Sequence, residues 1–200
     1  MARRTFFSFH YRPDVHRSWN VRNSWVTKDR EDAGFFDSGL FEKKQRESDD
    51  SLKNYIRDGI IGTSVVCVLN GNATYSRRWV RYEIVRGLLN KNGMLTVDIH
   101  SVQNLEQKTS TRGRDPFDYI GVYRADDGRV YVCESKEGKW VKYSDYSIAL
   151  DEKVLLFGAP KAGGGVSRLS AHYVRYDFVA QDGRKNLGGW IEDAAKAAGR

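Results

Sequence analysis

The sequence predicts an α/β fold in which a central parallel sheet is flanked by helices and followed by an antiparallel elaboration toward the C-terminus. Two patterns predict this class. In the first hundred residues, short apolar runs alternate with segments of helical periodicity, as in strands joined by helical crossovers. In the second half, short alternating segments are separated by tight turns, as in an antiparallel meander.

The elements of the first half follow from local patterns. An aromatic run and two apolar runs are typical of buried strands, and the stretches between them have apolar residues at helical spacing. We expect, in order, a central strand over 4–11, a helix over 14–28, a strand edge and loop over 34–40, a capped helix over 48–57, a strand over 64–69, a helix over 76–90 and a strand over 94–100. The capped helix starts with Ser48 followed by two acids, and the helix over 76–90 has Val80, Ile84 and Leu88 on its core face.

The second half changes in style. Residues 119–143 alternate in hydrophobicity around two turns, 158–165 form a glycine-rich loop, and 187–198 form a closing helix. No linker is long or polar enough to separate two domains. We therefore expect a single domain over 1–200, with a core over about 4–118, an antiparallel extension over about 119–157 and a closing segment over about 166–198.

The composition restricts the class of protein. The 33 lysines and arginines exceed the 26 aspartates and glutamates, which gives a net charge of +7, and 40% of the residues are hydrophobic. No apolar run approaches the roughly 20 residues of a membrane span, and the N-terminus becomes polar too early for a secretory signal. Cys67 and Cys133 lie outside any Cys-x-x-Cys pair, which argues against zinc. We expect a cytoplasmic protein that does not bind a membrane.

The helix over 76–90 carries the residues that point to chemistry. Trp79 and Glu83 are four residues apart and share a face, so an indole and a carboxylate are together available to a sugar ring. Arg77 and Arg78 lie in the first turn, where the helix dipole disfavours cations by roughly 0.3–1 kcal/mol. The sequence either tolerates that small penalty or collects an anion there. The alternative interpretation of Glu83 is a solvated surface carboxylate.

Five sequence blocks, taken in order, resemble one family. The blocks are 6–11, 21–28, 77–84, 115–119 and 176–183. The first, followed by Asp14, resembles the first-strand motif of TIR (Toll/interleukin-1 receptor) domains, and the Trp79 to Glu83 block resembles the helix of NAD-cleaving TIR domains. Together the blocks resemble the TIR-domain subunits of bacterial Thoeris antiphage systems, which implies a TIR-like, flavodoxin-like sheet. The stretch 119–143 is not part of a minimal TIR domain.

The resemblance implies an enzyme that cleaves NAD, releases nicotinamide and converts the ADP-ribose moiety into a signal, either a cyclic ADP-ribose isomer or an ADP-ribose conjugate. That signal would activate a separate effector protein. Glu83 would be the catalytic carboxylate, which stabilises an oxocarbenium-like centre. The substrate would contact Phe7 and Ser8, through backbone and hydroxyl, and also His10, Asp14, Arg77, Arg78, Trp79 and Tyr82. NAD is then a substrate, and no cofactor or metal is expected.

Other functions and partners stay open at this point. A non-catalytic TIR-like scaffold that acts through protein contacts is the alternative to an enzyme. A nucleic-acid-binding module would fit the net charge of +7, but the chain has no basic tail and no block of five like charges, so we expect no nucleic-acid partner. A phage-derived activator and a homo-oligomer are further expectations. The histidines His16, His100 and His172 are not spaced as metal ligands.

Overall fold

The structure is a computed structural model of the chain, and it describes residues 3–25 and 38–200. The side chains of residue 25 and of residues 38–42 lie outside this description. The end of the helix predicted over 14–28 and most of the region over 34–40 therefore fall outside the described residues. Among the described helices, none is long and apolar enough to cross a bilayer.

The strands form two separate sheets. A parallel sheet has the order β1-β2-β3-β8, and an antiparallel sheet has the order β6-β5-β4-β7. The parallel strands are β1 (Thr5–Phe9), β2 (Val65–Asn70), β3 (Gly93–Asp98) and β8 (Val174–Asp177). The antiparallel strands are β4 (Ile120–Arg124), β5 (Val130–Lys136), β6 (Lys139–Lys142) and β7 (Ser167–Arg168). The predicted α/β class with an antiparallel elaboration is confirmed.

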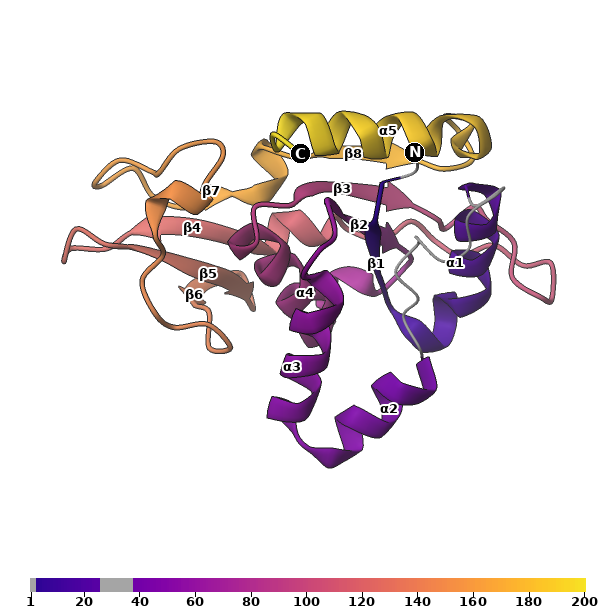
Figure 1. Cartoon of the computed structure of the whole chain (residues 1–200), viewed down its shortest axis with the longest axis horizontal. Coiled ribbons are helices and arrows are strands. Elements are labelled where there is room, and N and C mark those ends of the chain that lie inside the picture. Colours follow the sequence, from indigo (N-terminus) through magenta and orange to yellow (C-terminus); the bar gives the residue numbers. More distant parts are fainter. Residues whose placement is uncertain (1–2, 26–37) are drawn as a thin grey trace.

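Two features of the parallel sheet differ from the expectation. The strand predicted as central, β1, lies at one end of the strand order, and β2 and β3 are the central pair. At the other end, β8 comes from the segment after the antiparallel sheet and pairs in parallel with β3. Its four residues include Arg175 and Asp177, so the segment has no apolar run that would have marked it as a strand. The antiparallel strands β4 to β7 are thus inserted between β3 and β8 (Figure 1).

The helices largely follow the predicted pattern. They are α1 (Tyr11–Trp25), α2 (Ser38–Glu47), α3 (Asp49–Ile60), α4 (Arg78–Leu89) and α5 (Gly183–Ala197). Short 3₁₀ turns lie at Thr74–Ser76, Pro116–Tyr119, Glu152–Val154 and Leu169–Ala171. Ser48 caps α3 by accepting a hydrogen bond from the backbone N–H of Ser51, as predicted. Residues 38–40 are helical, so the loop prediction was wrong there.

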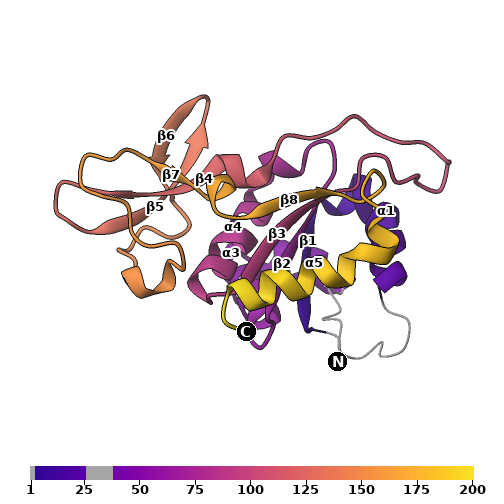
Figure 2. The same cartoon turned by 90° about the horizontal axis from the view of Figure 1, so that it is seen from above.

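Two hydrophobic cores cover the two faces of the parallel sheet. Helices α3 and α4 and the antiparallel sheet share one core, and α1 and α5 share the other. Figures 1 and 2 show the antiparallel sheet beside the parallel sheet, with α5 running along the strands. Side chains alternate along a strand, so Phe6 points to the α3 and α4 side and Phe7 to the α1 and α5 side. Ser8 therefore shares the face of Phe6, toward α4.

Candidate active site

The carboxylate predicted to be catalytic is buried at the junction of β1 and α4. Glu83 is only 4% exposed, and the hydroxyl of Ser8 donates a hydrogen bond to its Oε2. Local patterns explain the positions of both side chains. Side chains alternate along β1, which places Ser8 on the α4 side, and Glu83 lies one helical turn after Trp79. Glu83 is therefore not a solvated surface carboxylate.

Burial also changes the protonation of Glu83. Removal from water raises the pKa of its carboxyl group to about 8, and the hydrogen bond from Ser8 opposes this rise only in part. The carboxyl group thus holds a proton over most of the neutral range. Since a strongly raised pKa in a cavity is typical of functional groups, this environment supports a catalytic role.

Glu83 lines a cavity of about 480 Å³ at the carboxyl end of β1. The wall is formed by the end of β1, the first turn of α1, the end of α2 and the first turns of α4. The lining residues are Phe9, His10, Tyr11, Arg12, Gln45, Arg46, Ser76, Arg77, Arg78, Trp79, Val80 and Glu83. Ligands of open parallel sheets bind at this end of the strands, and the volume suits a small molecule.

The cavity is rich in positive charge. Four arginines line it, and two of them, Arg12 and Arg46, had not been recognised from the sequence. They lie far from Arg77 along the chain, so no spacing could have shown that they share a wall with it. His10 is also in the wall, and its pKa is lowered by burial and by the charge of Arg77. A site of this kind favours a polyanionic ligand.

The two arginines at the start of α4 have different surroundings. Arg78 forms ion pairs with Asp145 and Asp49, both at 2.7 Å, and its Cζ lies 4.6 Å from the centre of the Trp79 indole. Arg77 has no ion-pair partner within residues 3–25 and 38–200. Its charge acts on His10, whose pKa it lowers. The N-cap residue of α4 is Arg77, whose side chain makes no capping hydrogen bond. Of these two arginines, Arg77 is thus the one free to meet an anion, together with this helix end.

Four predicted substrate contacts do not line the cavity, and one of them is Ser8, whose hydroxyl is bonded to Glu83. The side chain of Phe7 is buried on the α1 and α5 side, with the Arg22 guanidinium 5.7 Å from its ring centre. Tyr82 is buried and packs at right angles to Trp79, 6.0 Å between ring centres. Tyr82 therefore supports the Trp79 indole, and the side chain of Phe7 lies on the face of the sheet opposite to α4.

The fourth of these residues, Asp14, lies in the first turn of α1 and packs against the loop after β2. A Cβ atom at Gly71 would fall 2.0 Å from Asp14 Oδ2, so only glycine allows this close approach. Burial raises the pKa of Asp14 to about 6, although Arg17 Nη1 lies 3.4 Å from its Oδ1. The position of Asp14 indicates a role in shaping the two loops at the carboxyl edge.

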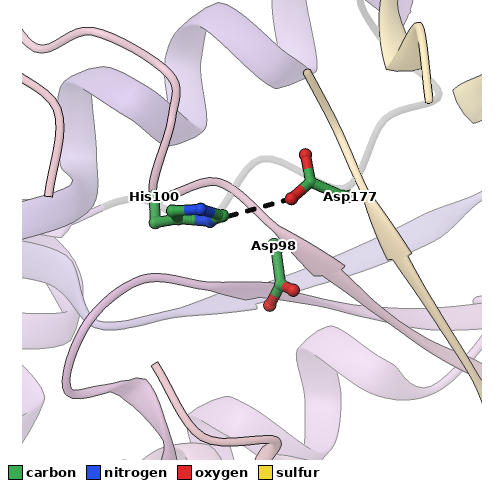
Figure 3. Close-up of side chains that lie close together, drawn as sticks. All are labelled: Asp98, His100 and Asp177. Atoms are coloured by element: carbon green, nitrogen blue, oxygen red, sulfur yellow. Dashed lines mark ion pairs between the residues drawn. The ribbon is translucent and has the colours of Figure 1, made fainter. Parts of the chain in front are cut away.

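The described residues include one group with metal-ligand chemistry. Asp98, His100 and Asp177 bring their ligand atoms within 4.8 Å of one another at the ends of β3 and β8 (Figure 3). His100 Nδ1 lies 3.9 Å from Asp177 Oδ2, a pairing that the sequence spacing had not shown. Asp98 is already paired with Arg112 and Arg175, at 2.7 and 2.8 Å. These guanidinium groups compensate its charge, so the arrangement is that of an ion-pair cluster joining β3 to β8.

The parallel sheet, its flanking helices and a buried glutamate on α4 define a TIR-like domain, and residues 6–104 match the family described as "Thoeris protein ThsB, TIR-like domain". The chain is also 38% identical over 194 residues to a protein of Bacillus cereus (strain MSX-D12) with the provisional name cyclic ADP-D-ribose synthase ThsB1. The alignment covers 96% of this chain and 100% of that protein. The chain belongs to the Thoeris ThsB family, as the five sequence blocks had predicted.

Proposed function

We propose that this protein cleaves NAD, releases nicotinamide and converts the ADP-ribose moiety into a signalling nucleotide in bacterial antiphage defence. The observation that carries the proposal is the buried Glu83, held by Ser8 beside the Trp79 indole in a cavity lined by cations. The name of the Bacillus cereus relative, a cyclic ADP-D-ribose synthase, supports the same activity. A cyclic product is the form that this name favours.

The proposed reaction breaks the bond between the anomeric carbon of the ribose and the nicotinamide nitrogen. The electron pair of that bond leaves with the nicotinamide, which changes from a cation to a neutral molecule. The positive charge that develops on the ribose is stabilised by the Glu83 carboxylate once it is ionised. A nucleophilic atom of the ADP-ribose moiety, or an acceptor molecule, then donates an electron pair to the anomeric carbon and loses its proton.

The cations of the cavity suit the diphosphate of NAD. Arg77 and Arg12 line the cavity and are exposed, and neither is paired with a carboxylate among the described residues. The first turn of α4 adds backbone N–H groups without a side-chain cap. We therefore assign the diphosphate to Arg77, Arg12 and the start of α4, and the ribose to Trp79 and Glu83.

The proposal also covers the partners, the activation and the cellular location of the enzyme. The product would diffuse to a separate effector protein, a phage-derived factor would activate the enzyme, and copies of the chain would associate into a homo-oligomer. NAD is the substrate, and the proposed chemistry uses Glu83 and the arginines without a further cofactor or metal. We place the protein in the cytoplasm, where NAD is available and where its free, buried cysteines Cys67 and Cys133 remain reduced.

The test is the release of nicotinamide from NAD by the purified protein, measured with and without lysate from phage-infected cells. Glu83→Gln keeps the shape of the side chain but cannot ionise, and we expect a loss of roughly 10²–10³-fold in turnover. Glu106→Gln, on an exposed loop, is the matched control and should behave as wild type. Mass spectrometry identifies the product. Full product formation by Glu83→Gln would show that the catalytic assignment is wrong and would favour a scaffold.

A further inference from the structure

The start of α4 is tied to the antiparallel region by one carboxylate. Asp145 follows β6, and its two oxygens accept hydrogen bonds from Arg78, with Nε 2.9 Å from Oδ2 and Nη2 2.7 Å from Oδ1. A bidentate pair of this kind fixes the plane of the guanidinium group as well as its position. The two residues are 67 positions apart, so tertiary structure alone brings them together.

Asp145 is the most buried member of a small charge network. Its side chain is 6% exposed, against 25% for Lys53 and 49% for Arg78. Lys53 Nζ lies 2.9 Å from Asp145, and Arg78 also reaches Asp49. The hydrogen bonds from Arg78, helped by Lys53, lower the pKa of Asp145 to about 2, so the carboxylate stays ionised. The network joins α3, α4 and the segment after β6.

The network ends on the wall of the cavity. The Arg78 guanidinium carbon lies 4.6 Å from the centre of the Trp79 indole, a distance at which a cation is attracted to an aromatic ring. Tyr82 packs against the same indole at right angles. Trp79 is thus held by two neighbours, and it precedes Glu83 by one helical turn, on the same cavity wall.

We propose that Asp145 is a positioning residue for NAD cleavage, which holds the Arg78 guanidinium on the Trp79 indole and thereby sets the cavity wall beside Glu83. This inference rests on the proposed function. Asp145 does not belong to the described lining of the cavity, so it acts through Arg78. The charge of Arg78 is compensated by its two carboxylate partners, so its main task is to hold the indole rather than to bind the diphosphate.

The experiment compares Asp145→Asn, Arg78→Lys and the double variant by kcat and KM for nicotinamide release under activating conditions. Each single variant removes the bidentate geometry, and we expect kcat to fall about tenfold while KM changes less than about twofold, because the ribose is misplaced but the diphosphate contacts remain. The double variant should be no slower than the singles, since both remove the same interaction.

Glu152→Gln is the matched control for this experiment. Glu152 forms a bidentate pair with Arg124, at 2.7 and 3.0 Å, and Arg124 lies in the same antiparallel sheet, but neither residue lines the cavity. We expect wild-type kcat and KM for this variant. A general weakening of the antiparallel sheet would instead lower activity in Glu152→Gln as well, and that result would overturn the positioning role of Asp145.

The outcomes separate the two proposals. If Asp145→Asn does not fold, Arg78→Lys decides, because Arg78 is half-exposed and Lys53 still pairs with Asp145 in that variant. Suppose that wild type is active and Glu83→Gln is inactive, as the proposed function requires. Full kcat in Arg78→Lys, or losses of the single variants that multiply in the double variant, would then overturn the inference alone. No nicotinamide release by wild type, or full activity of Glu83→Gln, would instead overturn the proposed function and this inference with it.

Discussion

The carboxyl edge of the parallel sheet has two halves that treat a buried carboxylate in opposite ways. Beside β1, Glu83 is 4% exposed and its described hydrogen-bond partner is a neutral hydroxyl group, that of Ser8. Beside β8, Asp98 is 1% exposed and is paired with Arg112 and Arg175. The first environment raises the pKa of its carboxyl group, and the second compensates a charge in place. An uncompensated carboxylate is available for chemistry, whereas a compensated one holds strands together.

After the loss of turnover expected for Glu83→Gln, the largest expected effect is a loss of stability on substitution of Asp98, the compensated carboxylate beside β8. Asp98→Asn removes the buried carboxylate that Arg175 and Arg112 share, and the loss of hydrogen bonds between charged groups typically costs up to about 3 kcal/mol. We expect the free energy of unfolding, measured by urea denaturation, to fall by about that amount. An unchanged stability would mean that the cluster does not join β3 to β8.

Glu83→Gln should have the opposite effect on stability. The pKa of Glu83 is about 8 in the folded protein and 4.5 in an ordinary setting, so above pH 4.5 the unfolded chain binds fewer protons than the folded one. Wild-type stability therefore falls from pH 4.5 to pH 8, by roughly 1.4 kcal/mol per pH unit at most. Glutamine does not titrate, so as the pH rises the free energy of unfolding of the variant should increase relative to that of wild type. The difference should reach up to about 3 kcal/mol at pH 7.

Urea denaturation at several pH values measures this gain. It should vanish below pH 4.5 and reach its maximum near pH 8, while Glu106→Gln, on an exposed loop, should show neither change. A constant difference between wild type and Glu83→Gln at all pH values would contradict the raised pKa. The protein thus gives up stability at neutral pH for a carboxylate in this position.

The smallest expected effect concerns the cations of the cavity. Arg77→Gln removes an exposed, unpaired charge from the proposed diphosphate site, so we expect KM for NAD to rise about five- to tenfold with little change in kcat. The rise should shrink at high salt, because exposed charges are screened. Arg129→Gln, an exposed arginine of the antiparallel region, is the control. An unchanged KM would assign the diphosphate to other groups.

Much of the fold could be predicted because its signals are local. The apolar runs of β2 and β3, the Ser48 cap of α3 and the core stripe of α4 all lie within a few residues of one another. The strand β8 could not be predicted in this way, because it is short and polar and is defined by its pairing with β3. The terminal position of β1 was missed for a separate reason: its apolar run indicates burial, but only the pairing shows that, among the described strands, β1 pairs with β2 alone.

The sequence by itself determined the α/β class, the family and the Trp79 to Glu83 face, because helical spacing places residues four apart on one side. Only the tertiary structure decided the protonation of Glu83 and the different roles of Arg77 and Arg78. Those properties depend on burial and on carboxylates such as Asp145, which lies 67 residues from Arg78. Electrostatic environment is a sum over neighbours in space, and spacing along the chain does not record those neighbours.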